Sequence, residues 1–71
     1  MEQAELAIKI PSSYTAKGYN IVAQLTQIKK EEWQKDGSWV SVVSLPAGLQ
    51  MELIDKLNKL THGRVQTKLL K

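Results

Sequence analysis

A chain of 71 residues with a formal net charge of +3 is long enough to form one domain with a thin core. It contains no cysteine, which excludes disulfide staples and thiolate metal sites and favours a reducing, cytoplasmic location. No apolar run reaches the roughly 20 residues that a membrane-spanning helix needs, and the acidic start at residues 1–5 does not resemble a secretion signal.

The first predicted element is a strand. Residues 4–10 alternate between apolar and polar side chains, which is the period of a half-buried strand. Pro11 ends this strand. Ser12 and Ser13 follow, and their side chains are suited to accept hydrogen bonds from the free N–H groups of a helix.

A helix is predicted from about Ser13 to Leu25, because apolar residues recur there every three to four positions. Gly18 lies inside this helix and lowers its stability by about 1 kcal/mol relative to alanine. The glycine therefore either weakens the helix or lets another element approach closely.

The middle of the chain predicts a β-hairpin. Residues 27–34 form its less regular strand, since Ile28 and Trp33 fall on opposite parity and indicate a bulge. Residues 35–38 supply a turn, because their glycine accepts a positive φ angle and their aspartate can bond to nearby backbone. Residues 39–45 are apolar on both faces, as expected of a central strand.

The last part of the chain predicts a second helix and a fourth strand. Residues 46–48 break the preceding strand, and an apolar stripe at helical spacing then runs from Leu49 to Leu60. Gly63 is placed to end this helix in a left-handed turn. Residues 64–70 alternate again and predict the closing strand.

The order β-α-β-β-α-β predicts an α+β domain with the ferredoxin-like fold. Right-handed crossovers would place both helices on one face of a four-stranded antiparallel sheet, with the first and third strands in the middle. The other face would stay open. No linker or low-complexity segment interrupts the pattern, so we expect residues 1–71 to form a single domain.

The charges are unevenly distributed along the chain. Residues 1–55 carry five bases and seven acids, a net charge of −2, whereas residues 56–71 carry five bases and no acid. This division indicates either a solvated basic end or a basic surface that faces an acidic partner, most commonly RNA. The predicted RNA-binding residues of this segment are Lys56, Lys59, His62, Arg64, Lys68 and Lys71.

These six side chains are expected to converge on one surface that binds phosphates without reading sequence. Lys29, Lys30 and Lys35 can extend that surface, although the acidic residues beside them also fit a mixed, solvated strand.

The residue types give little support to catalysis, so we expect a non-catalytic module without cofactor or metal. His62, the only histidine, stands at the predicted end of the second helix, where a cap or a phosphate contact fits better than a general base. Glu31 and Glu32 are adjacent in a strand and point to opposite faces, which is wrong for a carboxylate pair that shares a proton. No phosphate-binding glycine loop or metal-ligand spacing occurs.

Two tryptophans, Trp33 and Trp39, flank the predicted hairpin turn. We expect them to pack across from each other or to dock on a partner protein. The ferredoxin-like sheet is also the scaffold of an RNA-binding module that stacks bases on aromatic residues of its central strands. Those strands have too few aromatic residues here, so this mode of RNA binding is disfavoured.

The stretch IKKEEWQKDGSW at residues 28–39, followed by LPAG at residues 45–48, resembles the C-terminal domain of the archaeal SBDS ribosome-maturation family. AIKIP at residues 7–11 and KLNKLTHG at residues 56–63 are similar as well, so the resemblance covers nearly the whole chain. It implies a ferredoxin-like domain, akin to a C-terminal domain of translocating elongation factors, that contacts the large ribosomal subunit beside an elongation-factor-like GTPase.

Two functional hypotheses follow. The first is a ribosomal protein or ribosome maturation factor that binds rRNA of the large subunit through the basic C-terminal segment. The alternative is an adaptor that docks its open sheet face or its hairpin on a translational GTPase or a ribosomal protein. The sequence leaves open whether the chain is a free-standing protein or an excised domain.

Overall fold

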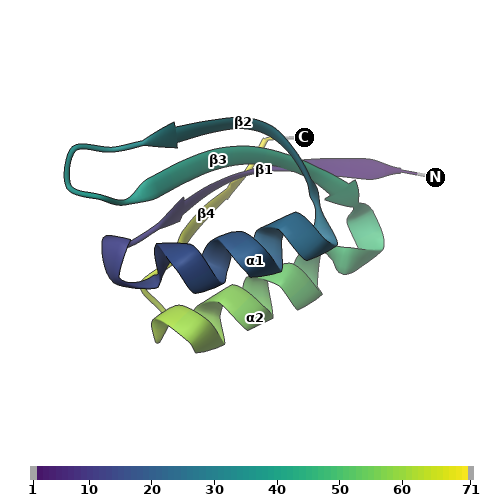
Figure 1. Cartoon of the computed structure of the whole chain (residues 1–71). Coiled ribbons are helices and arrows are strands. Elements are labelled where there is room, and N and C mark those ends of the chain that lie inside the picture. The colour runs from purple at the N-terminus through teal and green to yellow at the C-terminus, as the bar shows by residue number, and fades with distance from the viewer. Residues whose placement is uncertain (1, 71) are drawn as a thin grey trace.

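The computed structural model describes residues 2–70, and in this range four strands and two helices follow the predicted order. The elements are β1 (Gln3–Ile10), η1 (a 3-10 turn, Ser12–Tyr14), α1 (Thr15–Leu25), β2 (Gln27–Trp33), β3 (Trp39–Pro46), η2 (a 3-10 turn, Ala47–Leu49), α2 (Gln50–Thr61) and β4 (Gln66–Leu69). The strands form one antiparallel sheet in the order β2-β3-β1-β4, so β1 and β3 are central. Both helices lie on one face of the sheet (Figure 1), which confirms the ferredoxin-like arrangement.

The core lies between the sheet and the two helices. Alternate residues of β1 and β3 point towards the helices, because side chains of a strand alternate between its faces. The buried apolar side chains are Ala4, Leu6, Ile8, Ile10, Val22, Trp39, Val43, Leu45, Leu53 and Leu57. The intervening residues of the two central strands line the opposite face, which no helix covers (Figure 1).

Gly18 sets how closely α1 approaches the sheet. A Cβ atom at this position would lie 2.6 Å from Cδ1 and 3.2 Å from Cγ2 of Ile10. Ile10 is itself fully buried, so its side chain has little room to move. Of the two roles considered for the glycine, the close approach of another element is confirmed.

The start of α1 differs from the prediction. Ser12 and Ser13 lie inside a 3-10 turn, and Tyr14 occupies the N-cap position of α1, so the expected capping by the serines is wrong. The physical reason is that the chain turns directly at Pro11, whose carbonyl accepts a hydrogen bond of 2.9 Å from the Tyr14 amide. The tight turn takes up both serines before the helix begins at Thr15.

The hairpin between β2 and β3 confirms both the predicted bulge and the predicted turn. The register shifts at Lys29, which has no partner in β3. In the turn, Oδ1 of Asp36 accepts hydrogen bonds from the amide (3.0 Å) and the hydroxyl (2.7 Å) of Ser38. Gly37 has a φ angle of 90°, and a Cβ there would lie 2.9 Å from Cβ of Ser12. The tip of the hairpin is therefore held against η1.

The end of α2 is fixed by a left-handed turn and a buried hydroxyl. The turn begins at His62 (φ 56°, ψ 40°), one residue earlier than predicted, and continues through Gly63 (φ 81°). Histidine tolerates this backbone region better than most residues do. The buried Thr61 hydroxyl donates to the Leu57 carbonyl (2.7 Å) and accepts from the Val65 amide (3.0 Å). These bonds lead the chain into β4, which is shorter at both ends than the predicted strand.

Candidate nucleic-acid interface

The predicted RNA-binding residues of the basic C-terminal segment do not share one surface. Lys56 and Lys59 are exposed on α2, in the helical layer. Lys68 is exposed on β4 and pairs with Ala7, so it points to the open face of the sheet. The sheet separates these lysines, and the expected convergence is therefore wrong for them. Lys71 lies outside the described residues.

The outer surface of α2 has a balanced charge. Glu52 lies four residues before Lys56, and Asp55 lies four residues before Lys59. Residues four apart are neighbours on one face of a helix, and opposite charges at this spacing offset each other. The two lysines of α2 therefore do not create a strongly basic patch.

His62 and Arg64 follow α2 and point to different parts of the molecule. The His62 ring packs edge-on against Tyr14 in η1, with ring centroids 6.2 Å apart. Arg64 instead helps to line a hollow of about 290 Å³ at the end of β1, together with Lys9 and Asp36. Of the two, Arg64 is the residue that approaches the basic side chains of the sheet.

The three predicted lysines of the hairpin stand among acids. Lys30 points to the open face, where it lines a hollow of about 350 Å³ with Glu31 and Glu32. Lys29 lies at the bulge of β2, and Lys35 lies in the turn between the strands. Glu32 shares the open face with Lys30, whereas Glu31 pairs with the buried Ser41 and points to the other face, so the hollow beside β2 has no net charge from side chains on its own face.

The two tryptophans are register partners with ring centroids 6.3 Å apart, which confirms that they pack across from each other. Trp39 is fully buried and also contacts Tyr19 of α1, at 5.1 Å between centroids. Its parity in β3 directs it under the helix, so the prediction that it contacts a partner is wrong for this fold. Trp33 is 56% exposed and stays available to a partner.

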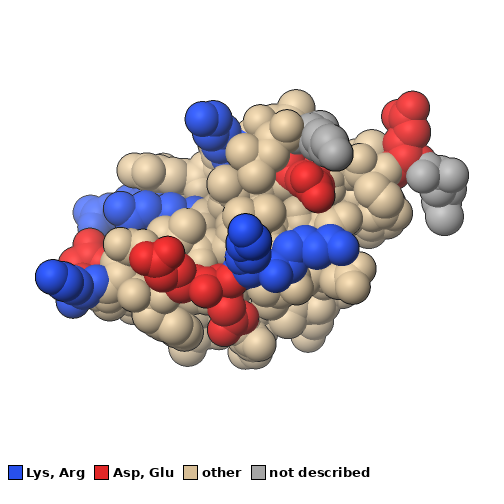
Figure 2. Space-filling view, turned by 90° about the horizontal axis from the view of Figure 1, so that it is seen from above, with Lys and Arg blue, Asp and Glu red and all other residues tan. Residues whose placement is uncertain are grey.

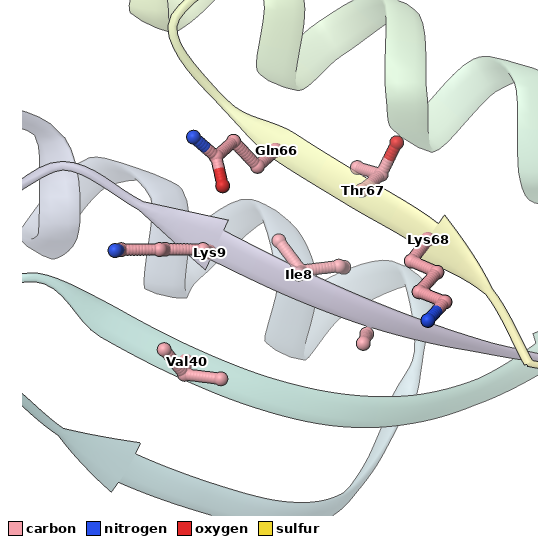
Figure 3. Close-up of a pocket in the computed structure, with 7 residues that line it drawn as sticks. Ile8, Lys9, Val40, Gln66, Thr67 and Lys68 are labelled. Atoms are coloured by element: carbon pink, nitrogen blue, oxygen red, sulfur yellow. The ribbon is translucent and has the colours of Figure 1, made fainter.

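A second hollow on the open face carries two lysines and no acid. It has a volume of about 220 Å³ and lies where β1, β3 and β4 run side by side (Figure 3). Its lining residues are Ala7, Ile8, Lys9, Val40, Gln66, Thr67 and Lys68. Elsewhere this face mixes basic and acidic side chains (Figure 2).

Lys9 was not among the predicted binding residues. Its alternation against the apolar residues of β1 indicated that it faces away from the core, and this signal was present in the sequence. What the sequence lacked was the pairing of Lys9 with Gln66, which brings β4 and Lys68 beside it.

Asp36 is the acid next to this basic region. Hydrogen bonds from the hydroxyl and then the amide of Ser38 lower the pKa of Asp36, and the positive charge of Lys9 lowers it further. Asp36 is therefore ionised at neutral pH and offsets part of the positive charge of Lys9 and Arg64 at the end of β1.

Between residues 2 and 70, no group of three or more histidine or acidic side chains is arranged to hold a metal ion. Within the same range, neither helix combines the length and the apolar character needed to cross a membrane.

Comparison with known proteins identifies the family. Residues 4–71 match the family described as "SBDS protein, C-terminal domain". The chain is 44% identical over 70 residues to the "Ribosome maturation protein SDO1 homolog" of Methanothermobacter thermautotrophicus, covering 99% of this chain and 30% of the relative. It is 30% identical over 71 residues to the protein of the same name from Aeropyrum pernix, covering 100% of this chain and 30% of the relative. The chain thus spans about a third of these relatives, and it belongs to the SBDS protein family through the C-terminal domain.

Proposed function

We propose that this domain is a non-catalytic ribosome-binding module that acts in maturation of the large subunit and contacts rRNA through basic side chains on its surface. The observation that carries the proposal is the family match over residues 4–71, whose curated relatives are named as ribosome maturation proteins. Because the chain spans only 30% of those relatives, the proposal concerns binding by this module and not the whole activity of the longer proteins.

The surface chemistry supports the rRNA part of the proposal. Basic side chains such as Lys9, Arg64 and Lys68 are exposed to solvent. Contacts between such side chains and phosphates supply affinity that does not depend on base sequence and that falls with rising salt. The module would therefore recognise the shape and charge of an rRNA surface.

Co-sedimentation with purified large subunits of Methanothermobacter thermautotrophicus tests this proposal. We expect the chain to pellet with large subunits at low salt, to bind small subunits more weakly, and to lose affinity steadily as salt rises. A chain that stays in the supernatant at low salt would contradict the proposal. Binding that does not weaken with salt would contradict its electrostatic basis.

A second candidate is a protein adaptor that docks on a translational GTPase or a ribosomal protein. It is favoured by one observation, the exposed Trp33, which borders a hollow of about 480 Å³ with Glu32, Lys35 and Asp36. Tryptophan with a polar rim is typical of the residues that dominate protein interfaces.

Ribonuclease treatment and Trp33→Ala separate the two candidates. Adaptor binding should survive digestion of exposed rRNA and should be lost in Trp33→Ala. Binding to rRNA should show the opposite pattern.

A further inference from the structure

We propose that the rRNA contact is made by the open face of the sheet, where Lys9 and Lys68 bind the phosphate backbone of one RNA strand along β1 and β4. This inference rests on the proposed function and names the surface that serves it. It assigns the central role to a lysine near the start of the chain, and it excludes the outer surface of α2 as the main contact.

The distribution of acids favours the hollow along β1 and β4. Its lining includes the bases Lys9 and Lys68 and no acid, so its net charge is +2. In the neighbouring hollow beside β2, Lys30 and Glu32 project from the open face and their charges cancel, whereas Glu31 pairs with the buried Ser41 and points to the other face. A polyanion therefore meets net positive charge in the first hollow and no net charge in the second.

The strand register places the two lysines on the same face of adjacent strands. Lys9 pairs with Gln66 and Ala7 pairs with Lys68, so the two lysines stand diagonally across adjacent strands. Diagonal neighbours in an antiparallel sheet are about 7–8 Å apart. This is the separation of their positions on the strands, and the two flexible side chains extend from there in different directions (Figure 3). The Gln66 amide beside Lys9 is a further donor.

Arg64 extends the line of donors beyond the hollow. It lines the adjacent depression at the end of β1 together with Lys9 and Gln66. Among the described residues that line this depression, Asp36 is the one acid; it accepts two hydrogen bonds from Ser38 and offsets part of the positive charge. Lys68 on β4, Lys9 on β1 and Arg64 in the loop before β4 therefore lie in succession at this end of the sheet.

The floor of the hollow indicates that the backbone of the RNA is bound and that its bases are not. Ala7 and Val40 face the hollow, and the aromatic Trp39 points to the helices on the other side. Base stacking on a sheet needs aromatic rings on its open face. Small aliphatic side chains permit close approach of a strand whose phosphates meet the flanking lysines.

Two double variants with the same change of charge test the inference. Lys9→Glu/Lys68→Glu reverses the proposed contact, and Lys56→Glu/Lys59→Glu is the matched control on the opposite side of the molecule. All four lysines are exposed, so circular dichroism should match that of the wild type. The α2 variant should unfold at a slightly lower urea concentration, because its glutamates create like-charge pairs with Glu52 and Asp55. Affinity is measured for purified large subunits and for deproteinised large-subunit rRNA over a range of salt concentrations.

We expect the open-face variant to bind both probes on the order of 10–100-fold more weakly at fixed low salt. The slope of log binding constant against log salt concentration should become about 1.4 less steep, because two contacts with single-stranded phosphates are lost. The α2 variant should stay within about 3-fold of the wild type, since its lysines make no phosphate contact in this arrangement. Lys9→Gln/Lys68→Gln removes the two charges without reversing them and should therefore lose less affinity than the glutamate variant. It keeps the test valid if the glutamates disturb the fold.

The outcomes distinguish this inference from the proposed function. If the wild type does not bind large subunits at all, the proposed function itself fails. If the wild type binds but the α2 variant loses as much affinity as the open-face variant, or more, the inference is overturned while the proposed function stands. Wild-type binding to subunits without binding to deproteinised rRNA would overturn the inference together with the rRNA contact of the proposed function, and it would leave ribosome binding through a protein.

Discussion

Replacing Gly18 by alanine tests how tightly α1 lies on the sheet. The new Cβ would stand 2.6 Å from Cδ1 of the fully buried Ile10, far inside normal contact distance. Overpacking of this kind costs about 1–3 kcal/mol, while the better helix propensity of alanine offsets about 1 kcal/mol. We therefore expect Gly18→Ala to lower the free energy of unfolding by about 0–2 kcal/mol, although the same change in an open helix would raise it.

A second substitution shows whether the Ile10 side chain is the cause. Ile10→Val removes Cδ1 and alone should cost about 0.5–1.5 kcal/mol. In that background the nearest remaining atom is Cγ2 at 3.2 Å, which needs only a small shift. Gly18→Ala should then be neutral or stabilising, so the two changes should couple by about 1 kcal/mol.

Urea unfolding of the four proteins, followed by circular dichroism and tryptophan fluorescence, gives the free energies for this cycle. Stabilisation of the wild type by Gly18→Ala would refute the close packing. Additivity of the two changes within about 0.3 kcal/mol would refute the role of Ile10.

Three further predictions concern the core and the hairpin. The buried Ser41 hydroxyl finds no hydrogen-bond partner among the described residues. Ser41→Ala should therefore leave the free energy of unfolding in urea unchanged or raise it, and a decrease of more than about 1 kcal/mol would contradict this. Leu57 is fully buried, so Leu57→Ala should lower the free energy of unfolding by about 2–5 kcal/mol. Met51 is 66% exposed, so Met51→Ala should change that free energy by no more than about 0.5 kcal/mol. Equal effects of the two substitutions would refute the assigned burial. Folding lowers the pKa of Asp36, so the ionised carboxylate stabilises the folded state fully above about pH 4, and this stabilisation is lost as pH falls through the lowered pKa. Asp36→Ala should therefore lower the urea midpoint of unfolding at pH 7 but not at pH 2. A difference between the two proteins that does not depend on pH would count against the hydrogen bonds to Ser38.

Most of the fold could be predicted because local patterns and topology rules agree. The alternation of residues 4–10 and the stripe from Leu49 to Leu60 each specify one buried face, and right-handed crossovers then leave a single strand order. The start of α1 could not be predicted, since a serine pair after Pro11 fits both a helix cap and a 3-10 turn. The buried position of Trp39 depends on Tyr19 of α1 lying over it, which is a contact between distant segments.

The candidate site was predicted less well because the order of charges along the chain does not specify which of them share a surface in the fold. Lys56 and Lys68 belong to one basic segment, yet the chain turns at His62 and sends them to opposite sides of the sheet. Lys9 lies far from them in sequence but pairs with β4 in the fold. Strand parity could assign each lysine to a face, whereas only the register could bring Lys9 and Lys68 together.

The most direct measurement is a cryo-EM map of the chain bound to the archaeal large subunit, at a resolution that places side chains. The map should show an rRNA strand along β1 and β4, with phosphates in contact with Lys9 and Lys68 and the outer surface of α2 facing away from the RNA. An rRNA contact made by α2, or an open face turned to solvent or to a ribosomal protein, would contradict the proposed interface.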